Sequence, residues 1–310
     1  SAPILRDGIA YGAVRGLVVR FTKPEIAAVG GKVDIGNKHD NWLTRMQTVK
    51  YHFGYSFMKN LERSFRRVMC LSGCLTAYRR SVLLELEPVL EKRSVCGVPI
   101  KYGEDRFLTR QIVKAGYHTT MTLEAVCRTV APTNLGTYFS QQLRWRRSNI
   151  VDYVGGMSHV WRLNPIIAIH FFSLFGLLVA YPALLIQAVV TQVFFPLLVL
   201  HIAIVTVFGV VYRVQTRKLP REERVGALSF IPITLVMPVT YALLTPLAFF
   251  TLDSGSWETR GHLVPEAALP EAAASESSTR MEAVTLRALA LQHDSSAADS
   301  ATVTAEVRVA

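Results

Sequence analysis

The sequence predicts an α/β layer fold followed by a helical membrane region. Strand-like and helix-like segments alternate over residues 1–162, and residues 163–250 are almost continuously apolar. The final part, residues 265–310, is rich in Ala, Glu and Ser and has no sustained apolar pattern, which is typical of a disordered tail. Only residues 281–292 interrupt that tail with a short helical pattern.

The α/β part can be divided into elements by its apolar spacing and its breaker residues. Helical spacing indicates helices over residues 8–21, 41–65, 81–90, 107–115 and from an N-cap at Asn134 to about Val154. Strand-like runs cover residues 27–29, 32–35, 68–71, 119–123 and 125–130, with Gly30-Gly31 breaking the first pair. The apolar stripe of the second helix is interpreted as core, and it comprises Trp42, Met46, Val49, Phe53 and Phe57.

The charge is unevenly distributed along the chain. The formal net charge is +11, and residues 265–310 contribute seven acids against three Arg, so the preceding part carries about +15. Arg144, Arg146, Arg147 and Arg162 lie just before the apolar part, which favours lipid head groups and cytoplasmic placement. We expect a membrane lipid partner and no nucleic acid, since no nucleic-acid-binding module accompanies these residues.

The apolar part contains two candidate spans, residues 166–189 and 191–212, each near the ~20 residues that cross the hydrocarbon layer. Basic residues before the first span and at 213–224 after the second predict that both ends of the pair face the cytoplasm. The third stretch, residues 225–251, fits either a span or an interfacial or re-entrant segment, because it contains Pro232, Pro238 and Pro246.

The residues Gly103-Glu104-Asp105-Arg106 place two acids at the start of a predicted helix. Asp105 suits the role of a general base, and Glu104 could organise the loop around it. The alternative interpretation is a pair of solvated acids in a helix first turn.

Gln141, Arg144 and Trp145 share one face of the helix that follows Asn134. An Arg side chain can pair with a phosphate, and an indole can stack on a sugar ring. The alternative is an amphipathic helix that rests on a membrane. Together with Asp105, the spacing favours the transfer of a sugar from a nucleotide donor.

Four motifs in this order resemble the processive family 2 glycosyltransferases. This group includes hyaluronan synthases, NodC-type chitooligosaccharide synthases, chitin synthases and, more distantly, cellulose synthases. The resemblance covers about residues 20–261. The motifs are Ser-Gly-Cys-Leu-Thr-Ala-Tyr-Arg-Arg at 72–80, Gly-Glu-Asp-Arg at 103–106, Gln-x-x-Arg-Trp at 141–145 and Ser-Gly-Ser-Trp-Glu-Thr-Arg-Gly at 254–261.

The resemblance implies a GT-A-like α/β fold, of which residues 1–133 form the C-terminal part. An amphipathic helical segment (134–162), the membrane region (163–250) and a Trp-x-x-Arg segment (251–264) would follow. The implied enzyme is a multi-pass protein of the plasma membrane with a cytoplasmic catalytic part. It would add sugars one at a time from a UDP-sugar to a growing polysaccharide, with Mg²⁺ or Mn²⁺ as cofactor.

The resemblance also implies roles for individual residues. Asp105 would be the catalytic base, and Ser72 and Gly73 would lie near the acceptor. Trp257 and Arg260 would close over the nucleotide. The residues that would bind donor and acceptor are Glu104, Arg106, Gln141, Arg144 and Trp145.

The chain departs from this family pattern at two points. Cys74 stands where the family usually has Pro, which could alter the acceptor loop. The uridine-binding half and the Asp-x-Asp metal motif are absent, so we expect that motif just upstream of Ser1 and no turnover by this polypeptide alone.

The leading hypothesis is inverting polymerisation from UDP-GlcNAc, with or without UDP-glucuronate, into a chitin-like or hyaluronan-like chain. Glu-Asp-Arg at 104–106, rather than the Thr-Glu-Asp of cellulose synthases, favours an N-acetylhexosamine donor. One alternative is a non-processive family 2 transferase that acts on a lipid carrier. The other is a non-catalytic membrane partner that lacks the metal motif.

Overall fold

The computed structural model describes residues 12–95, 98–100, 102–252 and 305–308. The helical pattern expected at 281–292, and both Trp257 and Arg260, lie outside these residues, as does a second unit, residues 257–304. Of the tail expected to be disordered, the structure describes only Ala305–Arg308, which form a strand.

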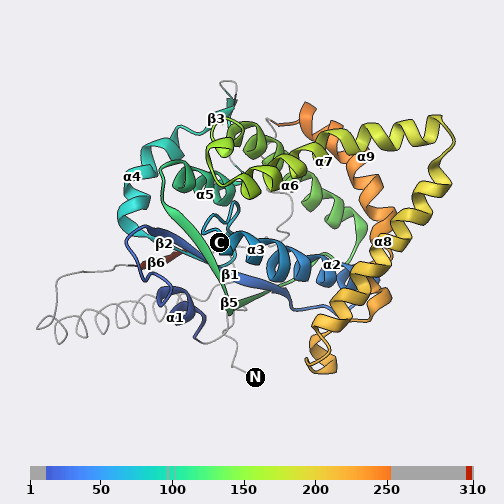
Figure 1. Ribbon diagram of the computed structural model, residues 1–310, viewed down its shortest axis with the longest axis horizontal. Helices are drawn as coiled ribbons and strands as arrows, with labels where there is room; N and C mark the ends of the chain where they lie inside the picture. The colour runs from blue at the N-terminus through green and yellow to red at the C-terminus, as the bar shows by residue number, and fades with distance from the viewer. Residues whose placement is uncertain (1–11, 96–97, 101, 253–304, 309–310) are drawn as a thin grey trace, which may run out of the picture. The chain divides into compact units, whose positions relative to one another are not determined.

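A mixed four-stranded sheet lies at the centre of the α/β part, in the order β5-β1-β2-β6 (Figure 1). The long strand β1 (Ile26–Ile35) pairs in parallel with β5 (His118–Thr129). On its other side it pairs antiparallel with β2 (Thr76–Arg79), which in turn pairs antiparallel with β6 (Ala305–Arg308). A separate two-stranded ladder joins β3 (Ser94–Val95) to β4 (Val98–Pro99).

The break expected at Gly30-Gly31 is wrong, because β1 continues through both glycines. A Cβ on Gly30 would come within 2.7 Å of a Leu71 methyl carbon, and one on Gly31 within 2.8 Å of the Ala125 carbonyl oxygen. The glycines therefore allow neighbouring chain to pack closely rather than ending the strand. The pairing with β5 accommodates them with a shift of register between Gly30 and Lys32.

Among the described residues up to Gly156, seven helical segments accompany the sheet. Asn41 and Asn134 cap two of them, and the Asn134 Oδ1 atom accepts a hydrogen bond of 2.9 Å from the Thr137 N–H. The helices expected over 41–65, 81–90 and 134–154 are confirmed, the first with a π-helical middle. The segments are α1 (Ala13–Val18), α2 (Trp42–His52), η1 (Phe53–Lys59), α3 (Asn60–Ser64), α4 (Arg80–Glu91), α5 (Glu104–Lys114) and α6 (Leu135–Gly156).

Two further expectations need correction. Residues 68–71 form no strand, because side chains bind their backbone: the Leu71 N–H donates to Thr109 Oγ1, and Thr119 Oγ1 donates to the Val68 carbonyl. The apolar stripe of α2 and η1 is only partly core. Met46 and Val49 are fully buried, whereas Trp42 and Phe57 are about half exposed.

Apolar side chains cover both faces of the sheet. Ala13 and Leu17 of α1 pack on one face against Val29 and Ala125. Helices α4 and α5 lie on the other face (Figure 1). There a larger cluster joins the sheet to η1, α4 and α5, and its members include Ala28, Tyr55, Val82, Leu86, Ile112 and Met121. The predicted α/β layer class is therefore confirmed.

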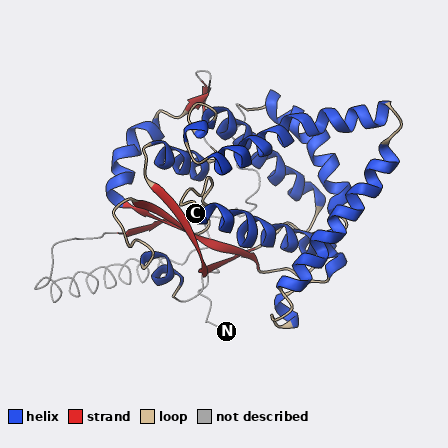
Figure 2. Cartoon of the chain, viewed as in Figure 1, coloured by secondary structure: helices blue, strands red, loops and turns tan. Residues whose placement is uncertain are grey.

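Three apolar helices follow the α/β part: α7 (Pro165–Val190), α8 (Phe194–Gln215) and α9 (Ile233–Phe250) (Figure 2). Their mean hydropathies are 2.0, 2.5 and 1.8, and each is long and apolar enough to cross a membrane. Helices α7 and α8 match the two candidate spans of the sequence. Tyr181 and His201 join them through a 2.8 Å hydrogen bond.

The third apolar helix, α9, lies along α6 over most of its length. Ile233 packs in one cluster with Tyr138, and Ala248 in another with Ile150. Between these points the Arg146 guanidinium lies 3.6 Å from the centre of the Tyr241 ring. Both ends of α9 therefore contact the helix that carries Gln-x-x-Arg-Trp.

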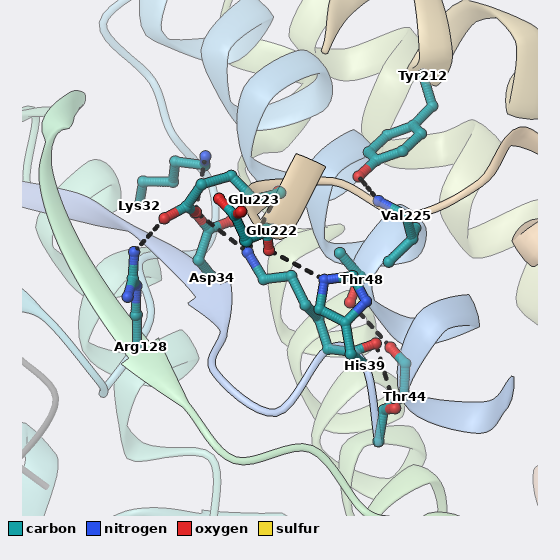
Figure 3. A network of polar contacts seen from close by, with 11 residues as sticks. Lys32, Asp34, His39, Thr44, Thr48, Arg128, Tyr212, Glu222, Glu223 and Val225 are labelled. Atoms are coloured by element: carbon teal, nitrogen blue, oxygen red, sulfur yellow. Dashed lines mark hydrogen bonds and ion pairs between the residues drawn. The ribbon is translucent and has the colours of Figure 1, made fainter. Parts of the chain in front are cut away.

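The loop between α8 and α9 is fastened to the sheet by charged groups (Figure 3). It contains a short 3₁₀ turn, η3 (Arg221–Glu223). The two carboxylate oxygens of Glu223 contact Arg128 Nη2 at 2.8 Å and Lys38 Nζ at 3.3 Å. Partial burial opposes the charge of Glu223, but Lys38 and Arg128 outweigh it and lower the pKa of this carboxyl.

We expect Glu223→Gln to destabilise the protein by about 1–2 kcal/mol, because it leaves the buried Lys38 ammonium without its counter-charge. Since the folded-state pKa of Glu223 is lowered, this stabilisation should be present near neutral pH and lost as the pH falls through that pKa. Thermal unfolding in detergent at neutral and acidic pH measures both effects.

The matched control is Glu222→Gln. Glu222 is exposed and contributes its backbone carbonyl, which lies 3.0 Å from His39 Nε2, so its side-chain charge should matter little. Equal losses of stability in both variants would contradict a specific role for Glu223.

Candidate active site

The acidic loop is shaped by Gly103, which precedes α5. Its φ of +66° lies in the left-handed region, and a Cβ there would collide with the Ser148 hydroxyl of α6. Gly103 therefore lets the loop lie directly against α6. Helix α5 begins at Glu104, so Asp105 lies in its first turn, as the sequence predicted.

The structure brings Asp105 to the Ser72-Gly73 loop. Asp105 Oδ2 accepts a hydrogen bond of 3.2 Å from the Gly73 N–H. Its Oδ1 accepts one of 2.8 Å from the Arg106 N–H. These two bonds orient the partly buried carboxylate, and they join two motifs that are about thirty residues apart in the chain.

The Ser72 loop is itself held by hydrogen bonds. Thr76 Oγ1 donates to the Ser72 carbonyl at 2.7 Å, and the Cys74 N–H donates to Ser72 Oγ at 3.3 Å. The second bond depends on the residue that departs from the family pattern, because a Pro at this position would have no N–H to donate. The Tyr55 hydroxyl also contacts Ser72.

An aromatic row, defined here as Trp145, Tyr51 and Tyr55, connects α6 to this loop. The Trp145 and Tyr51 ring centres are 6.3 Å apart, and the stacked rings of Tyr51 and Tyr55 are 6.0 Å apart. Burial raises the pKa of both phenols, so they remain neutral. Sequence reasoning missed both tyrosines, although their spacing of four places them on one helical face.

The three named residues of Gln-x-x-Arg-Trp differ in how closely they contact the aromatic row. Trp145 is half-buried against Tyr51, and Arg144 lies close enough to Tyr51 to oppose the rise in its pKa. Gln141 is half-buried on the same helix. Trp257 and Arg260 lie outside the described residues.

Glu104 and Arg106 occupy other positions around the site. Glu104 is exposed in the first turn of α5. The positive charge of Arg106 opposes the rise in the pKa values of Cys70, Asp152 and Tyr153. Asp152 and Tyr153 lie on α6, C-terminal to Trp145. Arg106 contributes to Asp105 through its backbone N–H.

A buried ion pair fixes α5 to α6. Arg110 Nε lies 2.9 Å from Asp152 Oδ1, and both side chains are more than nine-tenths buried. Burial raises the pKa of Asp152 to about 6, against the opposing charges of Arg106 and Arg110. A Cβ on Gly155 would come within 2.7 Å of the Arg110 guanidinium, so this glycine leaves room for the pair.

The described residues do not form a site for a divalent cation. Among them, no three His, Cys, Asp or Glu side chains lie together in a way that could hold a metal ion. The Mg²⁺ or Mn²⁺ that the resemblance implies therefore has no ligand set in this part of the chain.

This arrangement agrees with the glycosyltransferase resemblance: an acid at a helix start, the Ser72-Gly73 loop beside it and an adjoining helix that leads to apolar helices. The sequence model described as chitin synthase matches residues 9–288. The chain therefore belongs to the chitin synthase family, and the resemblance drawn from the four motifs is confirmed.

Individual relatives agree with the family assignment. The chain is 30% identical over 256 residues to an N-acetylglucosaminyltransferase of Sinorhizobium fredii, covering 82% of this chain and 61% of the relative. It is 30% identical over 255 residues to one of Rhizobium meliloti, covering 81% and 59%. A human protein, hyaluronan synthase 3, is 29% identical over 49% of this chain and 28% of its own length. The chain thus spans about 60% of the two bacterial relatives.

Among solved structures, a mannosyltransferase of Pyrobaculum calidifontis in complex with GDP-Man and Mn²⁺ aligns with a TM-score of 0.47. The sequence identity is 13%, and the alignment covers 79% of this chain and 61% of that one. The fold assignment accordingly rests on the sheet, the helices and the family.

We expect Gly103→Ala to displace the acidic loop, because the new methyl group meets Ser148 and the left-handed φ strains any residue with a Cβ. A shift of about 1 Å at Asp105 should lower sugar transfer about 10²-fold. Because this polypeptide alone is expected not to turn over, transfer rates of the full-length, membrane-embedded enzyme measure this effect. Gly54→Ala is the control, because a Cβ there meets nothing within 4 Å, and equal rates in the two variants would contradict the role of Gly103.

Proposed function

We propose that the chain is the acceptor-side part of a membrane-bound, inverting family 2 glycosyltransferase. The enzyme would polymerise N-acetylglucosamine from UDP-GlcNAc, with or without UDP-glucuronate, into a chitin-like or hyaluronan-like polysaccharide. The observation that carries this proposal is the contact between Asp105 and Gly73 beside the aromatic row. The printed activity of the bacterial relatives, N-acetylglucosaminyltransferase, supports the choice of donor sugar.

In the proposed reaction Asp105 acts as the general base. The acceptor hydroxyl attacks the anomeric carbon of the donor sugar, and its proton passes to the Asp105 carboxylate. The bond from the anomeric carbon to the diphosphate breaks, and UDP leaves with the electron pair. The N–H groups of Gly73 and Arg106 hold the carboxylate in place before the transfer.

The remaining residues supply binding. Arg144 would pair with the diphosphate, and Gln141 lies on the same helix face. The half-buried Trp145 offers an indole on which the acceptor sugars can stack, and the more deeply packed Tyr51 and Tyr55 support it from behind. We also propose that the enzyme requires Mg²⁺ or Mn²⁺, with ligands supplied outside the described residues.

We further propose a plasma-membrane protein with its catalytic part in the cytoplasm. Helix α7 begins near the α/β part, where Glu62 contacts His170 at 3.2 Å, and α8 returns to it, where His52 bonds Gln215 at 2.8 Å. Helices α7 and α8 would therefore form a transmembrane hairpin whose two ends lie on the same side of the membrane. Helix α9 would lie in the interface, because it runs along the polar helix α6.

Asp105→Asn should lower transfer by about 10²- to 10⁴-fold, because the amide cannot accept the hydroxyl proton. The amide oxygen can keep only one of the two hydrogen bonds from the Gly73 and Arg106 N–H groups, so thermal unfolding of the variant must show that it remains folded. Incorporation of labelled N-acetylglucosamine into polymer measures this loss. The neighbouring Glu104→Gln removes an exposed charge from the same turn and should have a much smaller effect. Polymer synthesis by Asp105→Asn at the normal rate would remove Asp105 as the base.

The interfacial placement of α9 can be tested with one lysine. Leu243 in the middle of α9 is 64% exposed, and Val207 in the middle of α8 is 61% exposed. Leu243→Lys should be tolerated because its ammonium can reach water, whereas Val207→Lys should cost roughly 2.5–3.5 kcal/mol in the hydrocarbon. The yield of folded protein extracted from membranes compares them, and equal losses would indicate that α9 also spans.

A further inference from the structure

Lys50 on α2 places its ammonium group against α6, within the Gln-x-x-Arg-Trp segment. Lys50 Nζ donates a 2.9 Å hydrogen bond to Gln142 Oε1. It also lies 5.8 Å from the centre of the Trp145 ring and 5.7 Å from that of Tyr138. Sequence reasoning did not single out this lysine, because no motif contains it.

The surroundings of Lys50 are unfavourable for a positive charge. Burial, together with the nearby Arg146 charge, lowers the pKa of Lys50 to about 8. Within the described part of the chain, the ion pairs found do not include Lys50. The two aromatic rings and one amide offset only part of the cost of enclosing an ammonium group.

The partner of Lys50 is also incompletely satisfied. A lysine can only donate, so the Gln142 amide must turn its oxygen towards Lys50. This orientation leaves the buried Gln142 Nε2 without a hydrogen-bond partner among the described residues. Burying the Lys50 ammonium and the unpaired Gln142 Nε2 both cost folding free energy, and an apolar side chain at position 50 would avoid burying the charge.

The contact between Lys50 and α6 bears on the position of the Trp145 side chain. The Lys50 ammonium lies over the Trp145 indole, while Tyr51, the next residue of α2, contacts the same ring. Trp145 is only half-buried, so part of its ring remains available to a ligand. A cation close to an indole is attracted to the ring face, which favours the observed contact between the two groups.

We propose that Lys50 is a positioning residue for acceptor binding, which holds the Trp145 indole and the Gln142 amide in their binding arrangement. This inference rests on the proposed function, because it assumes that the acceptor sugar stacks on Trp145. Lys50 itself does not touch the substrate; it acts through the two α6 side chains.

The test compares Lys50→Met and Lys50→Arg in the full-length enzyme in its membrane, with UDP-GlcNAc as donor and an N-acetylglucosamine tetrasaccharide as acceptor. Lys50→Met should raise the acceptor KM about tenfold and leave kcat within about twofold. Lys50→Arg keeps the charge, the donor and a cation that can lie over the indole, so it should restore most of the acceptor affinity. Lys92→Met, at an exposed lysine after α4, is the control and should match the wild type.

A double-mutant cycle shows whether Lys50 acts through Trp145. In a Trp145→Phe background, Lys50→Met should change the acceptor KM far less than it does in the wild type. The full effect in that background, an unchanged KM in Lys50→Met, or an equal loss in Lys50→Arg would overturn the inference. These outcomes differ from failure of the proposed function, in which the wild type itself would transfer no N-acetylglucosamine to the tetrasaccharide.

Discussion

The packing of α6 against three other helices places most residues of the candidate site. One side of α6 meets α2 through Lys50, Tyr51 and Trp145. A second side is fixed to α5 by the buried pair of Arg110 and Asp152. Helix α9 meets α6 again through Tyr241. Because α5 carries Asp105 and α6 carries Trp145, a change in how these helices pack would alter the distance between these two side chains.

Polar contacts also set how the apolar helices join the α/β part. Apolar packing has little directional preference, so it cannot by itself fix one rotation of a helix against a sheet. Ion pairs and hydrogen bonds require particular partners, and the joints at Glu223, His170 and Gln215 supply them. The α/β part and the apolar helices are thus connected through several charged or polar contacts in addition to apolar ones.

Local signals in the sequence predicted those features that depend on neighbouring residues. Asn134 marked the start of α6 because a side chain three residues away satisfies the helix N–H, and Gly103 marked the start of α5. The apolar length of α7 and α8 is likewise a local property. Predictions failed where distant residues decide: β1 continues through Gly30-Gly31 because Leu71 and Ala125 approach there, and residues 68–71 lose their strand to side-chain hydrogen bonds.

By itself the sequence determined the family, the α/β class with its apolar helices, and the residue types that the chemistry needs, because motifs and periodicity are written in local order. Only the tertiary structure decided that Asp105 meets Gly73, that Tyr51 and Tyr55 connect Trp145 to Ser72, and that α9 lies along α6. These contacts join residues far apart in the chain, and their formation depends on the shapes and charges of packed surfaces, which no short pattern of residues specifies.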